Sequence, residues 1–338
     1  MSTARSFHKF RPVVSRVITA LALLLTPASK ARQRPATAAV ATRWVTLGTL
    51  GGPVPMKARA QPANVLVVRG KYYVVDAGNG VAGQLVRAGI NCRDIGTIFI
   101  SHNHNDHNAD MGTLMGIEWT EGRSDPINLY GPPGTEAAIK GFLQFFAANA
   151  EIRASEQSMP TAPEKVFLAH DITQPGLIFQ DANIRVTAVE NTHFHFRPGS
   201  PAEGKQKSYA FRFATPDKII VYTGDTGPSE HVTELATGAD LLISEVINVA
   251  AEKEMLAGQK GWQLAPAALK ESLMRHFQQD HLSPEEVGKM AARARVKEVV
   301  LTHLVPPVPE SELQRVYVDG VKKFYSGKVA VASDLMTF

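Results

Sequence analysis

Residues Ser101–Asp110 have the sequence SHNHNDHNAD, with three histidines and two aspartates in ten positions. Imidazole and carboxylate groups are the ligands that zinc and similar borderline metals take from proteins. The apolar run Thr97–Ile100 precedes them and predicts a buried strand. The histidines then lie at the carboxyl end of that strand, where α/β folds place their sites. The pattern predicts a metal site on this loop; a solvated histidine-rich loop is the alternative.

Other potential ligands follow other predicted strands. His193 and His195 lie in VENTHFHF, Asp225 lies in VYTGDTG and His303 lies in VVLTHLVP, each just past an apolar run. A single histidine after a strand is most often an ordinary hydrogen-bonded residue. Because polar segments follow several strands in the same way, together they predict one shared site at one sheet edge.

The chain resembles the metallo-β-lactamase superfamily, in particular its branch of ribonuclease Z and arylsulfatase-like hydrolases. The resemblance covers about Trp44 to the C-terminus. It rests on five motifs in order, which are Asp76 in VVDAG, the His102–His107 cluster, His193, Asp225 and His303. It implies an α/β fold, a four-layer αββα sandwich in a single domain, with two zinc ions at one edge.

The resemblance also implies a role for each of these side chains. One zinc ion would take His102, His104 and His193, the other would take Asp106, His107 and His303, and Asp225 would bridge the two. Asp76 would orient a ligand or the bound water. Whether His193 or His195 is the ligand stays open at this point, and we favour His193.

Two further matches concern proton transfer. Glu245 lies in LISEV, and His281 lies in DHLSPEEVGKMA. The resemblance implies that they pair beside the metals, with His281 donating a proton to the leaving group; we count His281, Glu245 and Asp106 as catalytic residues. An imidazole is a suitable acid near neutral pH, and a carboxylate fixes its tautomer. The alternatives are a histidine that merely flanks a helix cap and a glutamate in an ordinary salt bridge.

The first 31 residues differ in composition from the rest. Basic residues precede the nine-residue apolar run Val17–Leu25, and small residues follow Pro27. This order is typical of a secretory signal peptide, and the run is far shorter than the roughly 20 residues that span a bilayer. We predict a signal peptide over residues 1–31, a flexible lead-in over 32–42 and a hydrolase domain over 43–338, in a periplasmic or secreted protein without a membrane span. A frayed N-terminus with a short apolar helix is the alternative.

The predicted cleavage changes the charge of the protein. The whole chain has a formal charge of +4, but residues 1–31 hold five of its 36 basic residues and no acidic one. The remainder has 31 basic against 32 acidic residues, a net charge of −1. A net charge near zero argues against a nucleic-acid partner.

The spacing of the motifs argues in the same direction. In ribonuclease Z-like proteins an arm that grips tRNA is inserted between the third and fourth motifs. Here 31 residues separate His193 from Asp225, and about fifteen of them, Phe194–Ser208, lie outside predicted strands. Extra length lies instead between Glu245 and His281, where we expect a helical cover.

These observations predict an exported dinuclear zinc hydrolase of small-molecule esters, with sulfate or phosphate esters as the main class. A metal-bridging hydroxide would attack the central atom, and His281 would protonate the departing oxygen. The alternatives are a ribonuclease Z-like tRNA 3′-end endonuclease, a lactone or β-lactam hydrolase, and a non-catalytic metal-binding or scaffold protein. A flavodiiron-type oxidoreductase is set aside, because it has a glutamate at the position of His104. A homodimer is left open.

Strands and helices are expected to alternate along the whole chain, which favours one α/β domain. Ser283, Pro284 and Glu286 predict a capped helix start, and Glu151–Pro163 is expected to be irregular. The single cysteine, Cys92, excludes an internal disulfide and is expected to be a small buried residue. The expected strands are Trp44–Leu47, Asn64–Arg69, Tyr72–Asp76, Thr97–Ile100, Ile127–Tyr130, Leu177–Phe179, Ile184–Glu190, Tyr209–Ala214, Ile219–Tyr222, Leu241–Ser244 and Val299–Leu301. The expected helices are Val81–Ala88, Met111–Thr120, Thr135–Asn149, Glu230–Ala236, Pro266–Phe277 and Pro284–Arg293.

Overall fold

Two mixed sheets of seven strands each form the centre of the computed structural model, which describes residues 41–157, 159 and 161–338. In sheet order, the first sheet consists of β14 (Met336–Thr337), β1 (Arg43–Gly48), β2 (Ala63–Val68), β3 (Lys71–Ala77), β4 (Ile95–Phe99), β5 (Ile127–Gly131) and β6 (Phe167–Asp171). The second consists of β13 (Lys328–Val331), β12 (Glu298–Val305), β11 (Leu241–Ile247), β10 (Ile219–Tyr222), β9 (Tyr209–Ala214), β8 (Arg185–Glu190) and β7 (Gly176–Gln180).

Residues of the inner strands alternate between two apolar cores, because successive side chains point to opposite faces of a sheet. In β2, Val65 and Val67 pack in the core beneath the helices, whereas Leu66 packs in the core between the sheets. Since both faces are covered, these strands read as nearly continuous hydrophobic runs. Rings fill much of the core between the sheets, including the fully buried Phe99 and Phe213.

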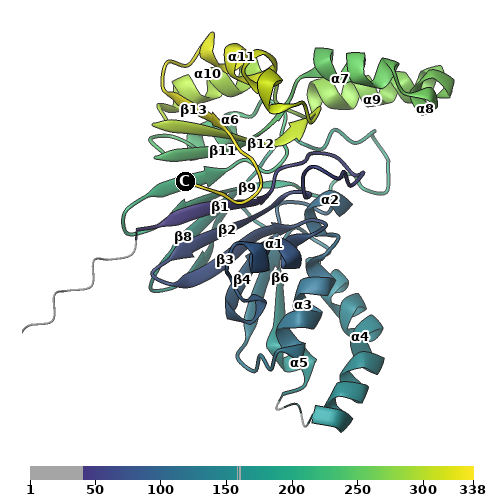
Figure 1. Cartoon of the computed structure of the whole chain (residues 1–338), viewed down its shortest axis with the longest axis vertical. Helices are drawn as coiled ribbons and strands as arrows, with labels where there is room; N and C mark the ends of the chain where they lie inside the picture. Colours follow the sequence, from purple (N-terminus) through teal and green to yellow (C-terminus); the bar gives the residue numbers. More distant parts are fainter. Residues whose placement is uncertain (1–40, 158, 160) are drawn as a thin grey trace, which may run out of the picture. The chain divides into compact units, whose positions relative to one another are not determined.

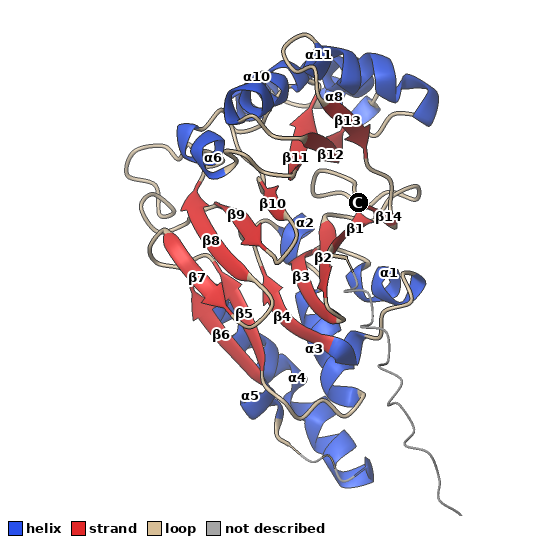
Figure 2. Cartoon of the chain, turned by 90° about the vertical axis from the view of Figure 1, so that its left-hand side faces the viewer, coloured by secondary structure: helices blue, strands red, loops and turns tan. Residues whose placement is uncertain are grey.

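Helices cover the outer face of each sheet (Figures 1 and 2). Residues of α1, α3 and α4 share one core with the first sheet, and residues of α6, α10 and α11 share another with the second. The predicted four-layer αββα sandwich is therefore confirmed, and Cys92 is buried in the first of these cores. The helices are α1 (Val81–Arg87), α2 (Asn105–Asn108), α3 (Met111–Thr120), α4 (Thr135–Gln157), α5 (Pro163–Val166), α6 (Glu230–Leu235), α7 (Val249–Ala257), α8 (Lys260–Leu264), α9 (Ala267–Gln279), α10 (Pro284–Ala294) and α11 (Asp319–Lys322).

Strand direction brings one set of strand ends to a common edge. β3 pairs with β4 in parallel, and β10, β11 and β12 are parallel neighbours. β8 runs antiparallel to β9, which runs antiparallel to β10, so β8 points the same way as β10. The carboxyl ends of these strands carry or precede every predicted site residue except His281, which precedes α10.

Some local expectations were wrong. The segment Glu151–Pro163 is not irregular throughout, because α4 continues to Gln157. Residues 151–157 are almost all exposed, so this last part of the helix has no apolar period to reveal it. Thr42, predicted as the end of a flexible lead-in, is buried and donates its backbone N–H to Asp217 at 3.1 Å. The rest of the lead-in, except residue 41, and the whole predicted signal peptide lie outside the described residues.

The expected helical cover consists of α7, α8 and α9, which lie together beside the second sheet in Figure 1. The following helix, α10, starts with the expected capping box: Ser283 accepts from the backbone of Glu286, whose side chain accepts from the backbone of Ser283. Within the described part of the chain, no helix has the length and apolar character needed to cross a membrane.

Candidate metal centre

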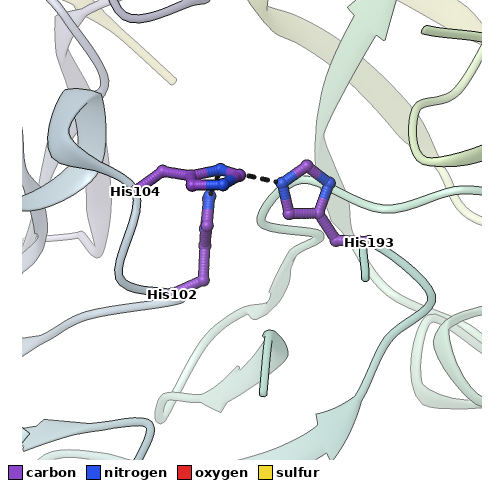
Figure 3. A group of neighbouring side chains, drawn as sticks. All are labelled: His102, His104 and His193. Carbon is purple, nitrogen blue, oxygen red and sulfur yellow. Dashed lines mark hydrogen bonds between the residues drawn. The ribbon is translucent and has the colours of Figure 1, made fainter. Parts of the chain in front are cut away.

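Three histidines form a first ligand cluster at the edge where the carboxyl ends of the strands lie. His102 follows β4, His104 precedes α2, and His193 follows β8 in the other sheet. Nδ1 of His104 lies 3.1 Å from Nε2 of His102 and 3.1 Å from Nε2 of His193 (Figure 3). Bonds of about 2.0–2.1 Å from a tetrahedral zinc ion would separate such nitrogens by about 3.3 Å. The cluster thus has the donor atoms and approximate spacing of a zinc site.

A backbone carbonyl sets the orientation of His193. Its Nδ1–H donates to the carbonyl of Asp280 at 2.9 Å, which leaves the Nε2 lone pair directed at His102 and His104. His195 instead has a half-exposed side chain and pairs with the carboxylate of Asp280. The structure therefore brings His193 into the cluster and leaves His195 outside it.

A second cluster comprises Asp106, His107 and His303, with Asp225 between the two clusters. Oδ2 of Asp225 lies 3.1 Å from Nε2 of His303, 3.4 Å from Nε2 of His107 and 3.9 Å from Nε2 of His102. Oδ2 of Asp106 lies 3.5 Å from the same nitrogen of His303. Asp106 and His107 come from α2, beside the first sheet, and His303 comes from β12 in the second sheet. Each cluster therefore draws its ligands from both sheets.

Several of these buried atoms lack a hydrogen-bond partner among the described residues. They include Nε2 of His107, both ring nitrogens of His303 and Oδ1 of Asp225. Leaving a buried polar atom unpaired costs about 1–3 kcal/mol. Nε2 of His107 and Nε2 of His303 face Oδ2 of Asp225 at 3.4 and 3.1 Å, and groups of three such residues place their ligand atoms within 4.8 Å of one another, a spacing that fits divalent metal ions. The donor set thus suits a divalent metal.

The charges of His102, His193 and Asp225 suit a cation. Burial lowers the pKa of His102 and His193 well below the ordinary value, so both are neutral, which is the form that binds metal. Burial works to raise the pKa of Asp225, but His303 and His107 outweigh it and hold that pKa well below its usual range. The side chain between the two clusters is therefore a carboxylate anion.

Asp76, at the end of β3, orients His107. Its Oδ2 accepts from Nδ1–H of His107 at 2.7 Å and from the hydroxyl of Tyr222 at 2.7 Å, and its Oδ1 accepts from the backbone N–H of Ser101 at 2.7 Å. This arrangement fixes the tautomer in which Nε2 of His107 faces the cluster. Asp76 has φ 60°, a left-handed conformation that aspartate tolerates better than most residues. No sequence pattern predicted the contributions of Ser101 and Tyr222.

The loop after β1 that contains Gly51 and Gly52 packs closely against the second cluster. A Cβ at Gly51 would lie 2.5 Å from Nδ1 of His303 and 2.5 Å from a methyl group of Val305. The backbone N–H of Gly52 donates to Oδ2 of Asp106 at 3.1 Å. This loop therefore supports two ligands and leaves no room for a side chain at position 51.

Glu245 and His281 form a buried pair next to both clusters. Nδ1–H of His281 donates to the Glu245 carboxylate, with N–O distances of 3.0 and 3.1 Å. Backbone N–H groups of Thr226 and Leu282 also donate to this carboxylate, at 2.9 and 3.2 Å. Burial works to lower the pKa of His281, but Glu245 outweighs it, so this pKa is raised. The capping box at Ser283 fixes the chain directly after His281.

Two residues that the sequence interpretation missed connect this pair to the first cluster. Asp280 accepts from Nδ1–H of His276 at 2.7 Å through its carboxylate, in addition to its contacts with His193 and His195. Nε2 of His276 lies 3.3 Å from Nε2 of His281. His276 and Asp280 are four residues apart at the end of α9, a spacing that places them on one helix face. This spacing, directly before His281, is visible in the sequence and could have identified both residues.

The chain matches the family model described as "Beta-lactamase superfamily domain" over residues 71–304. A protein named Ribonuclease Z from Mycobacterium sp. (strain KMS) is 32% identical over 266 residues, covering 78% of this chain and 85% of that protein. Ribonuclease Z from Mycobacterium bovis (strain BCG / Pasteur 1173P2) is 26% identical over 294 residues, covering 86% of this chain and 96% of that protein.

Solved structures agree on the fold. The metallo-β-lactamase fold protein YhfI from Bacillus subtilis has a TM-score of 0.60 at 20% identity and covers 88% of this chain and 98% of its own. The short form of human tRNase Z has a TM-score of 0.57 at 22% identity, with the same coverage of 88% and 98%.

Two expectations are overturned by these relatives, which are named for a ribonuclease. The first is that the main activity is hydrolysis of small sulfate or phosphate esters, and the second is that nucleic acid is not a partner. The ligand motifs could not determine which type of ester is hydrolysed, because the same metal chemistry serves many kinds of ester. The expectation about nucleic acid failed because a net charge averages over the whole surface and does not report the charge next to the site. What the motifs identified holds: the chain belongs to the metallo-β-lactamase superfamily of hydrolases.

Proposed function

We propose that this protein is a metal-dependent phosphodiesterase that cleaves RNA in the manner of a ribonuclease Z. The observation that carries the proposal is the 32% identity to a protein named Ribonuclease Z over 78% of this chain. The arrangement of the site supports it, since six buried candidate ligands and the exposed His104 meet beside a buried Glu245–His281 pair. Precursor tRNA is the substrate class to test first.

The two clusters would hold two zinc ions, with Asp225 shared between them. Bound there, the ions would lower the pKa of water to about 7 and stabilise the charge that develops on a phosphate group. The chain supplies the orientation: Asp76 holds His107, and the carbonyl of Asp280 holds His193, so that each presents Nε2. His102, His104, Asp106 and His303 complete the proposed ligand set.

His281 is the proposed proton donor. Because the Glu245 carboxylate accepts the hydrogen bond from its Nδ1–H, the proton available for transfer is the one on Nε2. That nitrogen would protonate the ribose oxygen that leaves when the phosphodiester bond breaks. The Glu245 side chain would stabilise the charged imidazole, because four hydrogen bonds from the ring and two neighbouring backbone N–H groups hold it in place.

The proposal is tested by metal analysis and an RNA cleavage assay on the purified protein. We expect about two zinc equivalents per chain and cleavage of a precursor tRNA near its 3′ end. Asp225→Ala should lose bound zinc and cleavage together. His231→Ala, a change at an exposed histidine on α6, is the matched control and should retain both. A zinc-loaded protein that leaves every RNA substrate intact would refute the proposed activity.

A further inference from the structure

A cleft of about 570 Å³ opens directly beside the first ligand cluster. His104 and His193 lie at its inner end, residues 194–197 form one wall and α9 forms the other. Its volume is within the range of about 300–1,000 Å³ that small-molecule sites occupy in proteins. Apart from His104, His193, His276 and Asp280, none of its described lining was needed to explain the metal ligands or the proton donor.

One wall of the cleft is aromatic. The ring of Phe194 lies against the ligands, with ring centroids 4.9 Å from His193 and 5.4 Å from His104. Phe196 stacks on Phe194 with a centroid distance of 4.8 Å and an interplanar angle of 27°. The rings therefore form a stack that starts at the metal ligands and leads outward along the cleft.

The opposite wall is apolar as well. Leu269 and Leu273 of α9 line it, and 56% of the surface of Leu269 is exposed. A flat apolar group inserted between this wall and the phenylalanines would cover surface that water now contacts. Arg197 and Arg275 lie at the same cleft, one on each wall. Arg275 is only loosely paired, since its nitrogen is 4.0 Å from Glu271.

Asp280 holds the inner part of both walls in position. Its carboxylate pairs with His195 on the loop and with His276 on α9, and its carbonyl accepts from the ligand His193. The loop and the helix are thereby tied to one residue at the inner end of the cleft. A cleft fixed in this way is formed before a ligand arrives, which lowers the entropic cost of binding.

We propose that this cleft binds the base of the nucleotide next to the scissile phosphate. The base would be unstacked from its neighbours and would stack on Phe196, while Arg197 and Arg275 would attract the adjoining phosphates. Proteins commonly bind single-stranded RNA by stacking unpaired bases on aromatic rings beside basic side chains. The inference rests on the proposed function for its substrate class. It accounts for RNA binding without an arm, since residues 191–208, all described, contain neither helix nor strand.

Two synthetic substrates test the proposal with the zinc-loaded protein. Uridine 5′-(p-nitrophenyl) phosphate carries a base, and methyl p-nitrophenyl phosphate does not. We expect Phe196→Leu to lower kcat/KM for the uridine ester about tenfold more than for the methyl ester, because it removes a stacking ring. Phe196→Tyr should restore the difference, and Phe145→Leu, at a ring on α4 that is 85% exposed, is the matched control. Equal effects of Phe196→Leu on both esters would overturn the inference.

Binding separates a failure of the inference from a failure of the proposed activity. Calorimetry with uridine 5′-monophosphate should give a Kd about tenfold higher for Phe196→Leu than for the wild-type protein, whereas inorganic phosphate should bind both equally. If neither ester is hydrolysed but this difference in Kd is observed, the phosphodiesterase assignment is wrong and the base site stands. If both esters are hydrolysed and the Kd values for the nucleotide agree, the base site is wrong and the activity stands.

Discussion

The carboxylate of Asp76 accepts a hydrogen bond from Nδ1 of His107 at 2.7 Å, with both side chains fully buried. Asp76→Asn should weaken zinc binding about 10–100-fold, because an amide no longer favours the His107 tautomer that presents Nε2. Asparagine tolerates the left-handed backbone at this position, so the fold should be retained. Competition with a zinc chelator measures the change. Asp94→Asn, at an exposed aspartate, is the control; equal zinc affinity for all three proteins would show that Asp76 does not tune the site.

The glycine at position 51 is predicted to be essential for the second cluster. Gly51→Ala would place a methyl group 2.5 Å from Nδ1 of His303, so the histidine or the loop must shift. We expect the variant to lose about one zinc equivalent while it keeps its far-ultraviolet circular dichroism spectrum. Gly83→Ala, on α1 where an added methyl meets open space, should bind zinc like the wild type. Full zinc content in Gly51→Ala would mean that the loop yields without disturbing His303.

His281→Ala should separate chemistry from metal binding. The variant should keep its zinc but cleave RNA about 10²–10⁴-fold more slowly, because the leaving ribose oxygen needs a proton. A nitrophenyl phosphodiester, whose leaving group departs as a stable anion, should lose far less. Rates for both substrates, with zinc content measured in parallel, provide the comparison. If both rates fall by the same factor, His281 has a structural or substrate-binding role instead.

Glu118 on α3 should make stability depend on pH. Its side chain is fully buried, neither carboxyl oxygen is hydrogen-bonded within the described residues, and burial raises its pKa well above the ordinary value of 4.5. The folded state therefore keeps the proton after the unfolded state has released it. Its contribution to stability is complete below about pH 4.5 and is lost progressively as pH rises toward the folded pKa, with a limiting slope of about 1.4 kcal/mol per pH unit.

Glu118→Gln should remove that slope, so the difference in unfolding free energy between variant and wild type should grow in favour of the variant from pH 5 to pH 8. Urea unfolding at several pH values measures this difference, in which the titration of other groups cancels. A pH-independent difference for Glu118→Gln would show that this carboxyl ionises normally in the fold.

The signal peptide over residues 1–31 stays a prediction, and it bears on which RNA the protein meets. Expression in a bacterium followed by fractionation should yield a shortened protein outside the cytoplasm, with its new N-terminus near Ala31. The basic, apolar and small segments at the N-terminus are the basis for this expectation. Recovery of full-length protein in the cytosol would contradict export and would place the enzyme with precursor tRNA.

Sequence patterns predicted eleven of the fourteen described strands, all but β6, β13 and β14, and the side chains that gather in the two clusters, because both leave local signals. The clustered side chains lie at or just after apolar runs, and each of these runs forms a strand in the structure. Tyr222 left no such signal: it reads as one more apolar residue of β10, and its hydroxyl reaches Asp76 across 146 residues of sequence. The same holds for Asp280, whose importance depends on contacts with His193 and His195 that only the folded chain creates. The expectation of a small-ester substrate failed for a related reason: no motif includes the loop and helix side chains that line most of the cleft that we propose for RNA binding.

Because each ligand cluster takes residues from both sheets, binding of a metal there would be linked to the folding of the whole domain. His104 and His193 are 89 residues apart in sequence, so the unfolded chain does not present them together. A metal ion that binds only the folded chain stabilises it by about 2.7 kcal/mol when its free concentration is one hundred times its Kd. A stability change of this size alters the fraction of unfolded chain that proteases can attack. The lifetime of this protein in a cell should therefore increase with the supply of metal. A shortage of metal would lower the amount of the protein as well as its activity.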